Sequence, residues 1–206
     1  MESYLTVLES STWEQVIDKS RFIGIVYPVT NLEEIEARLQ EVRQTYPNAR
    51  HYVYAYRLHQ GKLEKSTDDG EPQGTGGRPV LDVLQYRQIW DVLIVVVRYF
   101  GGILLGTGGL TRAYGSTARN LMDMAPVGRL VPHQVYELEI GYDWYEPLKY
   151  RLKQFAWTVG EEEFLATVRL KVYIPWEEKD KFLAWLADFS EQRIIPSEVG
   201  MVLRPE

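Results

Sequence analysis

Hydrophobic and polar residues alternate along two stretches near the C-terminus, residues 135–142 and 164–174, as in half-buried strands. Between and after them, apolar residues recur at helical spacing at positions 145–155 and 182–189. A short strand near 156–160 and a last one at 199–203 complete the pattern. The predicted order is β-α-β-β-α-β, the ferredoxin-like arrangement.

The N-terminal part mixes helices and strands less regularly. We expect strands at residues 4–8, 13–17, 21–29, 51–58, 62–67 and 90–99, the last apolar enough to be central. Asn31 and Glu34 form a capping-box pattern at the start of a helix whose buried stripe includes Ile35 and Val42. Further helices are expected at 80–84 and 110–124.

Two prolines and a glycine between Ala125 and His133 separate these parts, which is typical of a domain junction. We therefore expect an α+β protein of two domains, residues 1–130 and 131–206. The chain of 206 residues is long enough for two modest cores.

Composition excludes several classes of site. The chain has no cysteine, so disulfides, thiol nucleophiles and cysteine-ligated metals are excluded. The first residues lack the basic start and apolar stretch of a signal peptide, and the longest apolar run, Val92 to Val97, is far shorter than the ~20 residues of a membrane helix. We expect a soluble, cytoplasmic protein that makes no membrane contact.

The charge is unevenly distributed. The net charge is −6, and residues 131–206 hold 9 Lys and Arg against 14 Asp and Glu. From Val92 to Met122 there is no acidic residue, whereas Arg98, Arg112 and Arg119 lie there. This segment is a local positive region in an acidic chain.

The segment GTGG occurs twice, at residues 74–77 and 106–109, and each copy leads into a predicted helix. Helix N-termini present unpaired N–H groups, so glycine-rich approaches to them can cradle anions. One terminus contributes only about 0.3–1 kcal/mol, so arginine side chains must contribute most of the affinity. The predicted ligand- or phosphate-binding residues are Gly74, Thr75, Arg78, Arg98, Tyr99, Gly101, Gly102, Thr107, Gly108, Gly109, Arg112, Ser116 and Arg119.

A structural role is the alternative for each of these residues, because glycines also permit sharp turns and close packing. The acids Asp68, Asp69 and Glu71 fit a turn that pairs with Arg78 or Arg98 and fixes the loops. The three histidines are widely separated and match no zinc motif, and no serine or threonine has a local base. We expect no metal, no cofactor and no catalytic residue.

Four segments carry a resemblance to a known family: SRFIG, HYVYAYRL, DDGEPQGTGGRPVLDVL and VVVRYFGGILLGTGGLTRAYG. Together they resemble the IMPACT family (UPF0029), in particular its short bacterial, YigZ-like branch. The resemblance implies an N-terminal domain similar to domain 2 of ribosomal protein S5. It also implies a ferredoxin-like C-terminal domain similar to domain V of elongation factor G, and a role in the regulation of translation.

The leading functional prediction is a non-catalytic, translation-associated protein that binds RNA or a ribosomal or translation-factor surface through the glycine- and arginine-rich face. Aromatics interleaved with arginine, such as Tyr99, suit stacking on single-stranded nucleic acid. One alternative is an enzyme that binds phosphate or a nucleotide, because the implied S5-like fold is shared with small-molecule kinases. Another is a pure protein-interaction module that docks a translation-regulatory partner.

Overall fold

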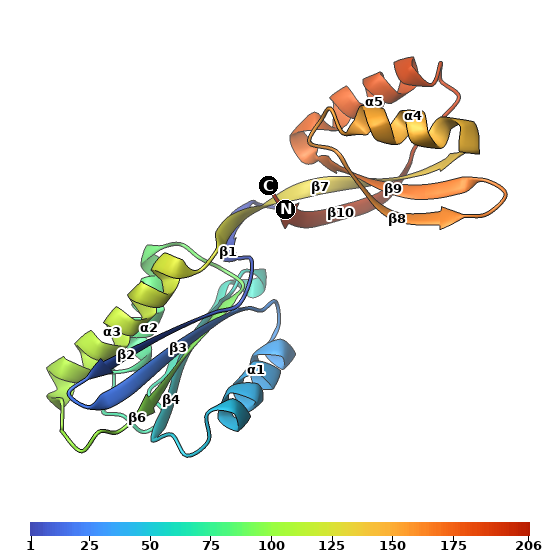
Figure 1. Ribbon diagram of the computed structural model, residues 1–206. Helices are drawn as coiled ribbons and strands as arrows, with labels where there is room; N and C mark the ends of the chain where they lie inside the picture. Colours follow the sequence, from blue (N-terminus) through green and yellow to red (C-terminus); the bar gives the residue numbers. More distant parts are fainter. The chain divides into compact units, whose positions relative to one another are not determined.

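The apolar run at residues 92–97 forms the middle of a five-stranded antiparallel sheet in the computed structural model, which describes all residues 1–206. The strand order is β2-β3-β6-β4-β5 (Figure 1). The strands are β2 (Ser11–Ile17), β3 (Ser20–Pro28), β4 (His51–Leu58), β5 (Leu63–Thr67) and β6 (Val92–Tyr99). The predicted central place of residues 90–99 is therefore confirmed.

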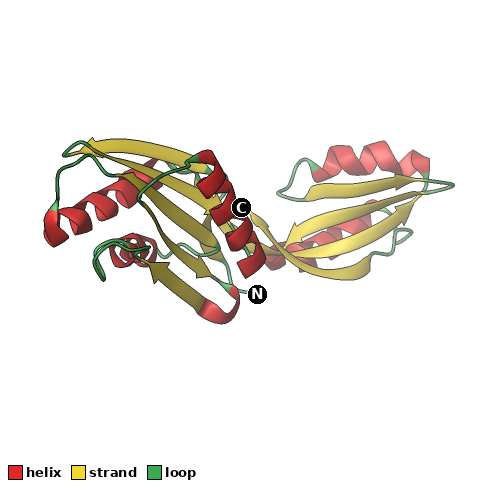
Figure 2. Ribbon diagram, turned by 90° about the horizontal axis from the view of Figure 1, so that it is seen from below, coloured by secondary structure: helices red, strands yellow, loops and turns green.

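Helices cover both faces of this sheet (Figures 1 and 2). Helix α1 (Leu32–Thr45) packs on the face that contains Leu93, Val95 and Val97. Helices α2 (Gly77–Tyr86) and α3 (Gly106–Met124) pack on the other face, with Ile94 and Val96. Successive side chains of a strand point to opposite faces, so a strand covered on both sides is apolar at every position.

The start of α1 follows the sequence prediction closely. The Asn31 side chain accepts a hydrogen bond from the Glu34 N–H at 2.9 Å. The Glu34 carboxylate accepts in return from the Thr30 N–H at 2.7 Å, one residue earlier than in a standard capping box. Strand β1 (Tyr4–Val7) is not part of this sheet; it pairs with β7 (Val127–Ile140), and Leu5 forms an isolated bridge with Ile89.

Helices α2 and α3 begin earlier than the sequence predicts. The first GTGG ends in the first residue of α2, and the second GTGG forms the whole first turn of α3. Glycine weakens a helix, but tertiary packing overrides this local preference. The two helices approach closely at Gly115, where an added Cβ atom would lie 3.6 Å from the Pro79 Cβ.

The second compact unit comprises Leu130–Glu206 together with Met1–Ser3, and the first comprises Tyr4–Arg129. The elements of the C-terminal part are β7 (Val127–Ile140), α4 (Tyr142–Leu152), β8 (Thr158–Phe164), β9 (Val168–Pro175), α5 (Lys179–Phe189) and β10 (Ser197–Pro205). The predicted order β-α-β-β-α-β is confirmed, and the strands pair as β10-β7-β9-β8. Residues of both helices, such as Leu148 and Phe182, pack on the sheet around Leu138.

One predicted strand of this part is wrong. Residues 164–174 alternate without interruption in sequence, yet Phe164 ends β8 and Val168 begins β9 after a tight turn. Phe164 and Val168 are directly paired in the hairpin, so both side chains lie on one face and the alternation continues across the turn. No helix of the chain is long and apolar enough to cross a membrane.

Candidate functional site

The backbone N–H groups of the first glycine loop already bind a carboxylate side chain of the same chain. The Asp68 carboxylate accepts hydrogen bonds from the N–H groups of Gly74, Gly76 and Gly77 at 2.8, 2.9 and 2.8 Å. Burial alone would raise the pKa of Asp68, but these three donors outweigh it and hold the pKa below its ordinary value. A ligand phosphate would have to displace this carboxylate, which corrects the expectation that Gly74 and Thr75 bind one.

Packing explains two other glycines. A Cβ atom on Gly77 would lie 2.7 Å from backbone atoms of Thr67, and one on Gly101 would overlap the backbone of Lys19. Neither position tolerates a side chain, so each glycine is required for close approach of two segments. Gly102 has φ +84° and makes a turn that L-residues with side chains rarely adopt.

The second glycine run is open, in contrast to the first. Gly106, Thr107 and Gly108 in the first turn of α3 are exposed, and no side chain caps this helix. The first turn contains no acidic residue. The Arg112 guanidinium lies beside it, since an added Cβ atom on Gly108 would be 3.5 Å from Arg112 Nη1. The start of α3 therefore combines a helix N-terminus with one arginine.

Arg98 is buried and paired, which corrects the expectation that it contacts a ligand directly. Its Nη1 donates to Glu71 Oε1 at 2.6 Å, and its Nη2 lies 3.4 Å from Ser20 Oγ. The Tyr114 hydroxyl also donates to Glu71 Oε1, at 2.7 Å. Burial first, and then the negative charge of Glu71, strongly raises the pKa of Tyr114, so this hydroxyl remains a donor. Glu71 therefore joins the first glycine loop to β6 and α3.

His51 adds a fourth member to this buried cluster. It lies directly opposite Arg98 in the pairing of β4 with β6. Its Nδ1 lies 2.7 Å from the carbonyl oxygen of Asp69, and its Nε2 lies 3.7 Å from Glu71 Oε1. We call His51, Glu71, Arg98 and Tyr114 the polar cluster.

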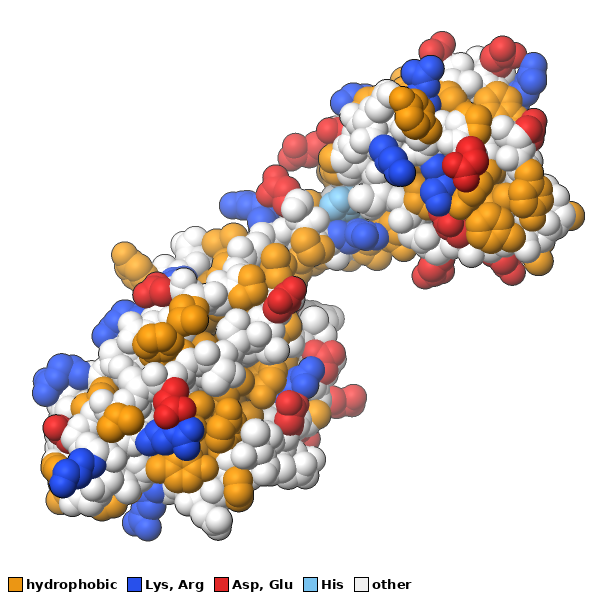
Figure 3. All heavy atoms as spheres, viewed as in Figure 1, with side chains coloured by type: hydrophobic (Ala, Val, Ile, Leu, Met, Phe, Trp, Pro, Cys, Tyr) orange, Lys and Arg blue, Asp and Glu red, His pale blue; other side chains and the backbone are white.

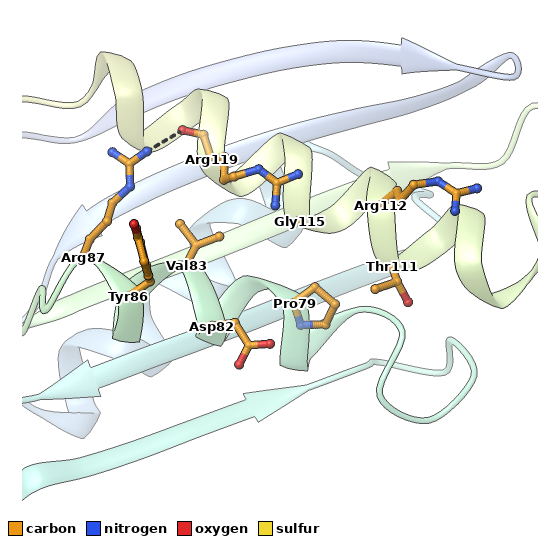
Figure 4. A pocket seen from close by; sticks show the side chains of 9 residues that line it. All are labelled: Pro79, Asp82, Val83, Tyr86, Arg87, Thr111, Arg112, Gly115 and Arg119. Atoms are coloured by element: carbon orange, nitrogen blue, oxygen red, sulfur yellow. Dashed lines mark hydrogen bonds between the residues drawn. The ribbon is translucent and has the colours of Figure 1, made fainter.

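A hollow of about 390 Å³ between α2 and α3 is the helix groove (Figure 4). Its lining residues are Pro79, Asp82, Val83, Tyr86, Arg87, Thr111, Arg112, Gly115 and Arg119. The Arg112 and Arg119 side chains extend along the exposed side of α3 in this view. Arg87 crosses from the end of α2 and bonds Asp123 and the Met122 carbonyl.

A second hollow, of about 490 Å³, lies between Glu71 and Pro72, which precede the first glycine segment, and the start of α3, and we call it the loop pocket. His51, Glu71 and Arg98 of the polar cluster line it, and Arg50 and Thr107 also border it. Its apolar lining residues are Pro72, Phe100, Leu104, Leu105 and Leu110. No residue of the first GTGG segment lines it, so the two glycine segments do not share this hollow, and the hollow is apolar with a neutralised ion pair rather than strongly cationic.

The ten arginines from Arg21 to Arg119 fall into two groups. Ion pairs with acidic side chains hold Arg21, Arg38, Arg43, Arg57, Arg78, Arg87 and Arg98. Arg50, Arg112 and Arg119 form no ion pair and no side-chain hydrogen bond within the chain, and all three line the loop pocket or the helix groove. The arginines without a partner are thus concentrated at the two hollows.

Several predicted site residues have other contacts. Arg78 pairs with Asp82 at 2.7 Å, and Ser116 accepts from Gln15 at 2.9 Å. Tyr99 donates to the Pro47 carbonyl and lines neither hollow, as is also true of Gly101 and Gly102. Of the predicted ligand-binding residues, Thr107, Arg98, Arg112 and Arg119 line a hollow.

Residues that the sequence did not single out also belong to the site. Arg50 lines the loop pocket, and Tyr86, which is 91% exposed, lines the helix groove. The only sequence signal for Arg50 and Tyr86 was an arginine or aromatic next to a predicted element end, which is too common to be specific. Two aromatics of the arginine-rich segment, which its sequence does suggest for stacking, differ: Phe100 is 47% exposed at the loop pocket, whereas Tyr114 is fully buried and unavailable for stacking.

Charged groups elsewhere on the first unit are mixed in sign. On the face seen in Figure 3, blue Lys and Arg side chains are interspersed with red Asp and Glu and with apolar groups. No group of three or more His, Asp or Glu side chains lies together as metal ligands would. Any anion affinity of this unit therefore depends on local contacts rather than on a broad positive field.

Three similar proteins extend over nearly the whole chain. A crystal structure of a hypothetical protein matches with a TM-score of 0.64 and 34% identity, covering 95% of this chain and 97% of that one. The IMPACT family member YigZ of Escherichia coli is 36% identical over 92% of this chain and 95% of its own length. The IMPACT family member YvyE of Bacillus subtilis is 33% identical over 92% of this chain and 88% of its own length.

More distant relatives match the first unit only. Protein IMPACT of Mus musculus is 34% identical over 50% of this chain and 34% of its own length. The model of the Impact N-terminal domain matches residues 18–122, which include both hollows, and a model of a domain of unknown function matches residues 138–193. The chain therefore belongs to the IMPACT family.

Proposed function

We propose that this chain is a non-catalytic, translation-associated protein that binds single-stranded RNA through the helix groove and the loop pocket. The observation that carries the proposal is the position of Arg50, Arg112 and Arg119, which have no partner within the chain and line these hollows. The association with translation rests on family resemblance alone. The contacts between these arginines and RNA phosphates are inferred from the positions of the arginines at the two hollows.

The spacing of the arginines favours an extended polyanion over a single small phosphate. The guanidinium of Arg112 lies beside Gly108, and that of Arg119 lies beside Gly115 at 3.3 Å from an added Cβ atom. Each side chain thus points one turn toward the helix start, so the two guanidinium groups stay about 10 Å apart along the axis. One phosphate cannot bridge that distance, whereas successive phosphates of one strand can.

Exposed aromatic rings lie next to these cations. Tyr86 shares the helix groove with Arg119, and Phe100 shares the loop pocket with Arg50. Unpaired bases stack on such rings, and each stacked base contributes about 1–3 kcal/mol. Thr107 and Thr111 are one turn apart on α3 and line the loop pocket and the helix groove respectively, so one strand can follow α3 from one hollow to the other.

Fluorescence anisotropy with a labelled single-stranded RNA tests the proposal across a series of salt concentrations. Three neutralised phosphates on a single strand give a log–log slope of affinity against salt of about −2. The double variant R112A/R119A should bind more weakly and lower the magnitude of the slope to about 0.7. Arg38→Ala is the matched control, because Arg38 pairs with Glu41 on α1, across the sheet from both hollows.

Binding that does not change with salt, or no binding at low salt, would refute the proposal. Equal loss in the Arg38→Ala control would show a general charge effect instead of a site. Thermal unfolding of each variant should stay close to that of the parent protein, because Arg112 and Arg119 are exposed and make no ion pair.

A further inference from the structure

Two hydrogen-bond acceptors at the loop pocket receive no hydrogen bond from any group of the chain. The Asp69 carbonyl oxygen can only accept, so its 2.7 Å contact fixes the hydrogen of neutral His51 on Nδ1. His51 Nε2 is then an acceptor. No group of the chain donates to it, and the Glu71 carboxylate lies 3.7 Å away.

Glu71 provides a second unused acceptor. Its Oε1 atom takes both internal hydrogen bonds, from Arg98 and from Tyr114. Its Oε2 atom takes none, and it is not among the fully enclosed polar atoms that lack a partner. Oε2 is therefore not completely enclosed, although the Glu71 side chain as a whole is only 4% exposed, and the residue lines the loop pocket together with His51. Two acceptors thus lie close together at one hollow.

We propose that the loop pocket binds one unpaired nucleobase that presents an amino group, such as cytosine or adenine, and selects against uracil. This inference rests on the proposed function and names what a bound strand would place in the pocket. An exocyclic amino group carries two hydrogens, one for Glu71 Oε2 and one for His51 Nε2. Unpaired RNA bases are commonly recognised in this way, by hydrogen bonds to their edges.

The local charge favours a neutral ligand over an ion. Arg98 compensates the negative charge of Glu71 at 2.6 Å, so the pocket has little net attraction for a cation. Arg98 offers no free donor to an anion beside Glu71, since its Nη1 and Nη2 already contact Glu71 and Ser20 and its Nε is fully enclosed, whereas Arg50, also in the lining, remains for a phosphate of the bound strand. A neutral N–H donor is the group that these acceptors lack.

Uracil presents the wrong edge to these acceptors. It has no amino group, and its single N–H lies between two carbonyl oxygens, which would face the Glu71 carboxylate. Repulsion and the unsatisfied acceptors would both oppose its binding. Phe100, Leu105 and Leu110 provide apolar contact for the face of any base, so discrimination arises from the edge alone.

The test compares oligo(C) with oligo(U) of about ten nucleotides each in the anisotropy assay at neutral pH. The two probes have equal length and charge, and both are pyrimidines. We expect oligo(C) to bind about fivefold or more tightly than oligo(U), because a well-matched base edge discriminates by at least about that factor. The salt slope should be the same for both probes, because it reports phosphates and not bases.

Two variants connect any preference to the pocket. Thr107→Trp fills the mouth from an exposed position, so the fold should be retained and the ratio of the affinities for oligo(C) and oligo(U) should fall to about one. Glu71→Gln replaces one acceptor by a donor and should shift the preference toward uracil. Because Glu71 pairs with buried Arg98, Thr107→Trp decides the matter if Glu71→Gln fails to fold.

The outcomes separate the two proposals. Equal affinity for oligo(C) and oligo(U) with a salt slope near −2 would refute the base pocket and leave RNA binding in place. A preference that survives Thr107→Trp would also refute it. Binding of neither probe at low salt would refute RNA binding, and the base pocket with it.

Discussion

Asp68 stabilises the first glycine loop by accepting three backbone N–H groups at once. Without this carboxylate, three N–H groups at the start of α2 would have no hydrogen-bond partner within the chain. Each such donor that is also buried away from water would lower the free energy of unfolding by about 1–3 kcal/mol. The same three contacts explain why the pKa of Asp68 is low although burial alone would raise it.

We expect Asp68→Ala to lower the free energy of unfolding by about 2 kcal/mol, and Asp68→Asn, which keeps one acceptor, by about half of that. The pH dependence has a definite sign. A carboxyl whose folded-state pKa is lowered stabilises the protein fully above its ordinary pKa, and this contribution is lost as the pH falls through the folded-state pKa.

Urea unfolding from pH 7 to pH 3 measures both effects. The stability difference between the parent protein and Asp68→Ala should be constant above about pH 5 and shrink below about pH 4. A difference that grows on acidification would contradict the assigned role.

The buried pair of Glu71 and Arg98 provides a second test at the residue scale. Removing one partner leaves the other charge buried and alone, so Glu71→Ala should destabilise the protein by about 3–5 kcal/mol. The double variant E71A/R98M should lose less than the sum of the single variants, because no buried charge remains. A double-mutant cycle from urea unfolding checks this, and additive losses would argue against coupling.

The two GTGG segments differ at the scale of the helix that each one starts. Gly77, the fourth residue of the first motif, begins α2 with its Cβ position 2.7 Å from backbone atoms of Thr67 in β5. Gly108, the third residue of the second motif, lies in the first turn of α3 with only the flexible Arg112 side chain within 4 Å of its Cβ position. The packing around these two glycines therefore differs, and at Gly77 the neighbouring strand β5 sets the requirement.

Gly77→Ala and Gly108→Ala test this difference in packing. Gly108→Ala should raise the free energy of unfolding by up to about 1 kcal/mol, because alanine favours the helix and nothing rigid opposes its Cβ atom. Gly77→Ala should lower it by more than 1 kcal/mol, because its Cβ atom would lie 2.7 Å from backbone atoms. Thermal unfolding compares the two, and equal effects would contradict this packing difference.

At this scale the sequence predicted most elements because apolar periodicity is a local property. The capped helix at Asn31, the central strand at 92–99 and the C-terminal element order were all visible in the pattern. The division between β8 and β9 was not visible, because Phe164 and Val168 lie on the same face and preserve the alternation across the turn.

At the scale of the whole molecule, the two compact units have separate hydrophobic clusters. We propose that residues 1–130 and 131–206 are independent domains. A fragment of residues 1–130 should unfold cooperatively and bind single-stranded RNA with a salt slope close to that of the full chain, since both hollows lie within it.

Circular dichroism and the anisotropy assay on the fragment measure these two properties. A fragment that folds but loses the salt slope would assign part of the RNA contact to residues 131–206. An unfolded fragment would refute independent folding.

The sequence by itself determined the element order, the acid-free segment from Val92 to Met122 and the resemblance to the family, since each depends only on residues close together in the chain or on their identity. It could not determine which charges are available to a ligand. That depends on pairing between distant segments: the register that sets His51 opposite Arg98, and the loop that brings Glu71 to the same guanidinium. Tertiary structure therefore decided that Arg98 is neutralised and that Arg50, Arg112 and Arg119 are not. An arginine is available to a ligand only where no acidic side chain of the same chain lies within hydrogen-bond distance of its guanidinium group.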